Sequence, residues 1–228
     1  MVAKKSEKTY DKVLAYIKSE IRRGSLKRGD PLPPERDLAE LLGVSRNSVR
    51  EALRTMTMMG FVSSVQGAGN FLSCDLETNL SEALQMMILL GETNYLQVSQ
   101  LRRGLESEMA RLAVLHITPS QINRLDALAQ KMATETDHKK GSTLDQKFHF
   151  LLCDAAGNKL ISSFFYAMLT TVNDFISTMY VRIMEDETQG AQLQACHREI
   201  VEALRAHDTE RATRAVCDHF DVVDRAVC

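Results

Sequence analysis

The sequence predicts a mainly α-helical protein of two domains, with one small β-hairpin confined to the first. Helical spacing of apolar residues dominates the 228 residues, and two short β-prone runs, at 61–65 and 70–72, interrupt it. The charge divides at the same place. Residues 1–72 carry 13 Lys and Arg against 8 Asp and Glu, a net charge of +5, which leaves −7 for the remainder. This division favours phosphate contact by the first domain only.

The first domain, residues 1–74, is expected to begin with three helices. Residues 8–23 form an amphipathic pattern, and Pro34 then suits the first turn of a second helix. The apolar face of that second helix comprises Leu38, Leu41 and Leu42. Gly43 tolerates the left-handed backbone that ends this helix, and Ser45 can cap the third through its hydroxyl.

The third helix has a core stripe and a polar N-terminus. The stripe consists of Val49, Ala52, Leu53 and Met56. The first turns beside it carry hydrogen-bond donors, which are Arg46, Asn47, Ser48 and Arg50. The second helix of a helix-turn-helix places such N-terminal residues against base edges in the major groove of DNA.

A β-hairpin follows this helix. Residues 61–65 and 70–72 are the two strands, and residues 66–69, which contain two glycines, join them. Helix, helix, turn, helix and hairpin in this order make a winged helix-turn-helix, whose hairpin tip can reach a neighbouring minor groove.

The rest of the chain is expected to be helical. Residues 75–94 are predicted to be a linker running into a connecting helix, and residues 95–228 to be an all-α bundle, so that this part contains six to seven helices. The six bundle helices span about 95–115, 119–136, 142–156, 158–184, 189–206 and 208–226. Gly141 and Ser142 are interpreted as the break before the third of these helices.

Composition excludes several classes of protein. A content of 44% hydrophobic and 25% charged residues is typical of a globular protein, and no apolar run approaches a membrane-spanning length. The basic segment 1–8 has no apolar run behind it, and we expect a cytoplasmic protein. The five cysteines show no paired spacing, so we expect reduced, mostly buried thiols.

Four residues of the second domain form a candidate metal site. Asp145 and His149 are four residues apart and therefore share one helix face, whereas His197 and His219 belong to two other helices. Three imidazoles and one carboxylate suit Zn²⁺, and also Ni²⁺, Mn²⁺ or Fe²⁺. The alternative is that these histidines are structural, since spacing alone does not force three helices to meet.

The first domain resembles the GntR family of bacterial transcriptional regulators. The resemblance rests on L-P-P-E-R-D-L-A at 32–39, G-V-S-R-N-S-V-R-E-A-L at 43–53 and a G-x-G wing at 67–69. It implies DNA contacts by the recognition helix and its surroundings, namely by Arg36, Ser45, Arg46, Asn47, Ser48, Arg50, Gln66 and Gly67. Asn47 and Ser48 depart from the usual Thr-Pro or Thr-Thr of this motif, which leaves the preferred base sequence open. The alternative is a merely solvated basic helix face.

The second domain is similar to the FCD ligand-binding domain of the FadR-type branch of that family. The matching patterns are R-x-x-L-E at 102–106, F-H…A-x-G-N at 148–158 and H-x-x-I-x-x-A at 197–203. In metal-binding members such positions hold a divalent ion, which implies the ligand set Asp145, His149, His197 and His219. The resemblance further implies a small carboxylate on the metal, with Arg102 as second anchor. Asn158 either assists this ligand or caps a helix.

Together these observations predict a metabolite-responsive transcriptional regulator, a homodimeric repressor on a palindromic operator. The rival interpretation is a metalloenzyme that activates water, but it leaves the winged domain unexplained. A third interpretation is a DNA-binding protein without an effector.

Overall fold

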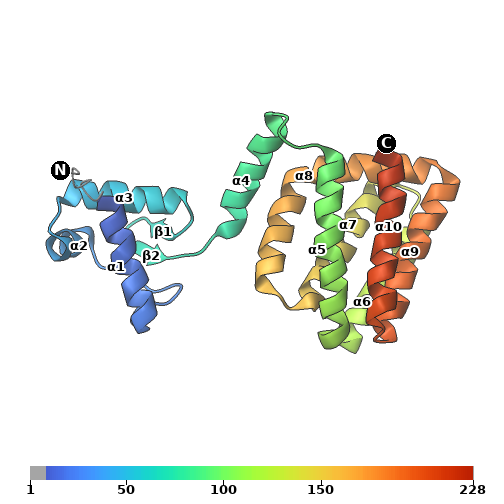
Figure 1. Cartoon of the computed structure of the whole chain (residues 1–228), viewed down its shortest axis with the longest axis horizontal. Coiled ribbons are helices and arrows are strands. Elements are labelled where there is room, and N and C mark those ends of the chain that lie inside the picture. The colour runs from blue at the N-terminus through green and yellow to red at the C-terminus, as the bar shows by residue number, and fades with distance from the viewer. Residues whose placement is uncertain (1–8, 228) are drawn as a thin grey trace, which may run out of the picture. The chain divides into compact units, whose positions relative to one another are not determined.

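The computed structural model describes residues 9–227, so the predictions for the basic segment 1–8 and for Cys228 lie outside the described residues. The chain forms two compact units, Met1–Asn79 and Leu80–Cys228, which are considered separately (Figure 1). The mainly helical class, with one small antiparallel sheet, is confirmed. Among the described residues, no helix combines the length and apolar composition that a membrane crossing requires.

The first unit is a three-helix winged fold. Its helices are α1 (Thr9–Arg23), α2 (Glu35–Leu42) and α3 (Arg46–Met58). They bury one core, to which α3 contributes the predicted stripe of Val49, Ala52, Leu53 and Met56. Leu41, which we expected to face this core, is 61% exposed, because the two-turn helix α2 buries only Leu38 and Ala39 fully.

The wing consists of β1 (Val62–Val65) and β2 (Gly69–Leu72), which pair antiparallel with Val62 opposite Leu72. The loop before α2 lies along β2, since the Leu32 amide donates to the Asn70 carbonyl at 2.7 Å and Pro31 bridges to Phe71. The wing is therefore fastened to the chain that enters α2.

Seven helices follow the wing. They are α4 (Leu76–Leu89), α5 (Tyr95–His116), α6 (Pro119–Thr134), α7 (His138–Ala156), α8 (Lys159–Glu185), α9 (Glu187–Arg205) and α10 (Thr209–Val227). The wing ends at Leu72, and α4 begins at Leu76 and spans the boundary between the units, so most of the segment 75–94 is helical. In the second unit, α5 and α10 run side by side, α9 packs on α10, and α7 packs on α5 (Figure 1).

The start of α7 corrects one prediction. Gly141 and Ser142 lie inside this helix, which begins four residues earlier at a cap where Asp137 accepts from the amides of Lys139 and Lys140. Glycine is needed at 141 for another reason. A β-carbon there would lie 2.9 Å from the Tyr180 ring, so the residue permits close packing of α8 on α7.

Candidate functional site

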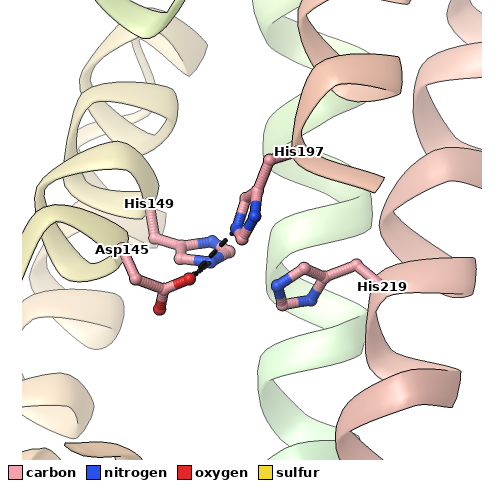
Figure 2. A group of neighbouring side chains, drawn as sticks. All are labelled: Asp145, His149, His197 and His219. Atoms are coloured by element: carbon pink, nitrogen blue, oxygen red, sulfur yellow. Dashed lines mark ion pairs between the residues drawn. The ribbon is translucent and has the colours of Figure 1, made fainter. Parts of the chain in front are cut away.

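Three helices of the second unit bring four ligand-type side chains together. Asp145 and His149 project from the buried face of α7, His197 from α9 and His219 from α10. Figure 2 shows the four side chains converging on one point from these separate helices. Their ligand atoms all lie within 4.8 Å of one another.

The cluster is compact and fully inside the protein. The Asp145 Oδ1 atom lies 3.0 Å from His197 Nε2 and 3.7 Å from His149 Nε2. The ring centroids of His197 and His219 are 4.8 Å apart, and those of His149 and His219 are 5.0 Å apart. None of the four residues is more than 4% exposed.

The cluster leaves buried polar atoms without partners. Among the described residues, Nδ1 of His197 and both ring nitrogens of His219 have no hydrogen-bond partner. An unpaired buried polar group costs about 1–3 kcal/mol, so several together at one point call for a further binding partner. Three imidazoles and one carboxylate are a donor set that Zn²⁺ and other first-row divalent ions accept, and the residues therefore fit a metal ion.

Glu106 of α5 completes this site and was missed from the sequence. It is fully buried, and its Oε2 atom pairs with His149 Nδ1. A carboxylate on the outer nitrogen of an imidazole fixes the ring and turns the other nitrogen toward a metal. The local signs were its place at the end of the R-x-x-L-E pattern and its spacing of four residues from Arg102 on one helix, and neither indicates a contact with His149.

The ionisable side chains of this cluster shift one another's pKa values. Burial alone would raise the pKa of Asp145, but the imidazoles of His149 and His197 outweigh it and hold that pKa well below its usual range. Burial would lower the pKa of His149, yet Glu106 and Asp145 raise it to about 9. Burial and repulsion by the other two rings keep the pKa of His219 well below its usual range. The carboxylates thus favour a positive charge at this point, which a protonated imidazole or a divalent ion can supply.

A small cavity lies against this cluster, with a volume of about 30 Å³. Its polar wall consists of Ser99, Arg102, Asp145, Tyr180 and His219. The remaining lining is apolar, from α8 and from Val98, Leu193 and Val223. That volume holds only a few atoms, so the geometry suits a small polar ligand.

Arg102 and Asn158, both expected near the effector, lie in different places. Arg102 is buried, and its Nε and Nη2 atoms contact Glu106 Oε1 at 3.0 and 2.9 Å, which leaves Nη1 without a partner among the described residues. Asn158 is exposed and caps α8, accepting from the amides of Leu160 and Ile161. The capping alternative therefore accounts for Asn158.

The cysteines beside the ligands do not join the site. Of the four described cysteines, Cys153 is buried, Cys196 and Cys217 are half-buried and Cys74 is exposed, so the expectation of mostly buried thiols was wrong for these four. On α9 and α10, residues next to Cys196 and Cys217 occupy the buried helix faces. The 100° rotation between consecutive helical residues turns the cysteines away from those faces.

The predicted DNA-contacting residues lie in the first turn of α2, at the N-terminus of α3 and at the wing. Ser45 caps α3 by accepting from the Ser48 amide at 3.1 Å. The side chains of Arg46 and Arg50 are 64% and 53% exposed. Among the other predicted contacts, those on the surface are Arg36, Asn47, Gln66 and Gly67.

Glu35, the first residue of α2, is a second carboxylate that was not singled out from the sequence. Its side chain receives hydrogen bonds from Arg50 Nε and Nη2 and lies 3.6 Å from Arg46 Nε. No local sequence pattern indicates these contacts, because Arg50 is fifteen residues away in the chain.

Comparisons with known proteins identify a matching family for each of the two units. Residues 9–72 match the family described as bacterial regulatory proteins, gntR family, and residues 97–222 match the FCD domain. The HTH-type transcriptional regulator LutR of Bacillus subtilis (strain 168) is 31% identical over 207 residues, which cover 90% of this chain and 94% of that protein. The putative L-lactate dehydrogenase operon regulatory protein of Escherichia coli (strain K12) is 27% identical over 221 residues, or 93% and 84% of the two chains.

A solved structure shares the fold. The GntR protein of Streptococcus agalactiae superposes with a TM-score of 0.61 at 24% identity, covering 95% of this chain and 97% of that one.

Proposed function

This chain belongs to the gntR family of bacterial regulatory proteins and carries an FCD domain, and we propose that it is a metabolite-responsive repressor that binds a palindromic operator as a homodimer. Membership of this family makes it a DNA-binding transcriptional regulator and not an enzyme. The finer parts of the proposal are the bound metal, the effector and the direction of regulation.

One observation carries the effector proposal. Two residues of the buried quartet of Asp145, His149, His197 and His219, namely Asp145 and His219, line a small cavity that Arg102 also lines. These four residues would hold the metal. Zn²⁺ is the first candidate, and Ni²⁺, Mn²⁺ and Fe²⁺ are the alternatives. When bound, the ion supplies a Lewis-acidic position for a ligand oxygen.

The protein's own residues define the class of effector. The Nη1 edge of Arg102 offers hydrogen-bond donors to a carboxylate, while the apolar wall favours a short carbon chain. A cavity of about 30 Å³ favours a small acid over a large one. Because one relative is named as the regulatory protein of an L-lactate dehydrogenase operon, lactate is the first acid to test.

The test of the effector is a thermal-shift screen of zinc-loaded protein against lactate, pyruvate, glycolate and citrate. A ligand present at 100 times its Kd stabilises the folded state by about 2.7 kcal/mol, so one acid should raise the melting temperature clearly. Arg102→Lys keeps the charge but loses the planar fork, and we expect it to lose most of that shift. No shift with any acid, or an equal shift in Arg102→Lys, would overturn the proposed pocket.

The same acid should then change DNA binding. Allosteric coupling is typically worth about 1–3 kcal/mol, or roughly 5- to 150-fold in affinity. For a repressor released by its effector, the acid should weaken binding to an operator duplex in a gel-shift assay. An acid that stabilises the protein without moving operator affinity would contradict its role as effector.

A further inference from the structure

Arg46 and Arg50 are exposed cations near the N-terminus of α3, and both face one carboxylate. Arg50 Nε lies 3.2 and 3.1 Å from the two carboxylate oxygens of Glu35, and Arg50 Nη2 lies 3.0 Å from Oε2. Arg46 Nε lies 3.6 Å from the same Oε2 atom, an ion pair without a hydrogen bond. One acidic side chain of α2 thus contacts both Arg46 and Arg50 of α3.

This carboxylate sits on a fixed support. Glu35 is the first residue of α2, where a negative charge is favoured by the helix dipole, and its side chain is only 23% exposed. The arginines are more than half exposed, so the less mobile partner of each pair is Glu35. Contact with it restricts the rotamers of Arg50 before any DNA arrives.

The geometry leaves the outer edge of Arg50 available. A guanidinium has five N–H donors, and the contact with Glu35 engages the one on Nε and one of the two on Nη2. The remaining donors, on Nη1 and Nη2, form the edge that can contact two acceptors of a guanine at once. Glu35 therefore holds Arg50 with this edge turned away from α2.

From these contacts we propose that Glu35 is a positioning residue for DNA recognition. It orders Arg50 for specific contacts, and its negative charge lowers the sequence-independent affinity of this helix for DNA. The inference rests on the proposed operator binding by α3. Two effects follow from one carboxylate. Ordering favours specific contacts, and partial neutralisation of two arginines weakens the generic attraction to phosphates.

The magnitudes decide which measurement is informative. Ordering one long side chain at an interface accounts for roughly 2- to 13-fold in affinity, and that factor applies to the sequence-specific complex. Removing one negative charge beside the phosphates steepens the salt dependence of non-specific binding by up to about one unit of slope. The ratio of specific to non-specific affinity reports both effects together.

The test uses the full chain and two duplexes. One is selected from a random-sequence library with the wild-type protein, and the other is its scrambled counterpart. We expect Glu35→Gln to bind the scrambled duplex more tightly and with a steeper salt dependence, and to show a specificity ratio lowered roughly 5- to 10-fold. Glu40→Gln is the matched control, since it removes the same charge from the exposed side of α2, and its ratio should stay at the wild-type value.

Two results would overturn the proposal. The first is an unchanged ratio in Glu35→Gln, whether neither affinity changes or both rise equally, and the second is an equal effect in Glu40→Gln. If Glu35→Gln melts at a lower temperature, Glu35→Asp provides the same test, because it keeps the charge but shortens the reach to Arg50. That variant should lose specificity without gaining non-specific affinity. A wild-type protein that selects no sequence at all would instead refute the proposed operator binding.

Discussion

Raising the pH should destabilise the metal-free helical unit between pH 7.0 and 8.5. Burial alone would lower the pKa of His149, but Glu106 and Asp145 raise it to about 9, against an ordinary value near 6.5. A raised pKa means that the folded state holds this proton more tightly than the unfolded state. The resulting stability is fully present below pH 6.5 and is lost as the pH rises through about 9.

The size of the effect follows from the two pKa values. The bound proton contributes about 2.5 kcal/mol at pH 7.0 and about 1 kcal/mol at pH 8.5, so the free energy of unfolding falls by about 1.5–2 kcal/mol. For a unit of this size that corresponds to a fall of roughly 3–7 °C in melting temperature. His219, whose pKa is lowered, titrates below this window.

The measurement is thermal unfolding by far-ultraviolet circular dichroism, with protein dialysed against a chelator and then with added Zn²⁺. A metal ion replaces the proton at the cluster, so the zinc-loaded form should show a nearly flat profile and the stabilisation by zinc should grow with pH. His149→Gln removes the titrating group and should flatten the metal-free profile. A flat metal-free profile in the wild type, or the same fall in His149→Gln, would refute this account of the cluster.

Three further outcomes are expected. Glu106→Gln should weaken zinc affinity about 10- to 100-fold in a chelator competition, and unchanged affinity would exclude its role in orienting His149. Arg46→Ala combined with Arg50→Ala should abolish sequence preference in a gel shift while leaving metal content intact; retained preference would contradict the assigned recognition helix. Gly141→Ala should cost about 1–3 kcal/mol by overpacking, whereas a substitution at Gly104, where a β-carbon meets open space, should not lower the melting temperature.

Patterns that depend on one element could be predicted from the sequence. The stripe of α3, its Ser45 cap and the hairpin are local, and the family resemblance placed them in a winged fold that the structure confirms. Asp145 and His149 share a face because they are four residues apart on one helix. Spacing within a helix therefore places half of the quartet on one face, whereas His197 and His219 were candidates on two other helices that spacing alone could not bring to this face, and the resemblance supplied the support for including them.

Contacts between elements could not be predicted in the same way. Gly141 was interpreted as a helix break because glycine disfavours helices, yet it lies within α7 to make room for Tyr180, a residue of another helix. In the sequence, Glu106 is only the last residue of the R-x-x-L-E pattern, and in the structure it forms an ion pair with Arg102. Its second contact, to His149, depends on how α5 packs against α7. The spacing of residues along the chain does not predict this packing.

Glu106 and Glu35 play comparable parts in the two units. Each is a carboxylate on a neighbouring helix that holds a nitrogen-bearing side chain of the proposed site, His149 in one case and Arg50 in the other. The environments make the consequences different. Glu106 is fully buried, so its loss would leave His149 without its carboxylate partner in a low-dielectric interior and should affect stability and metal affinity together. Glu35 is partly exposed and screened by solvent, so its loss should leave stability nearly unchanged and alter the choice between DNA sequences.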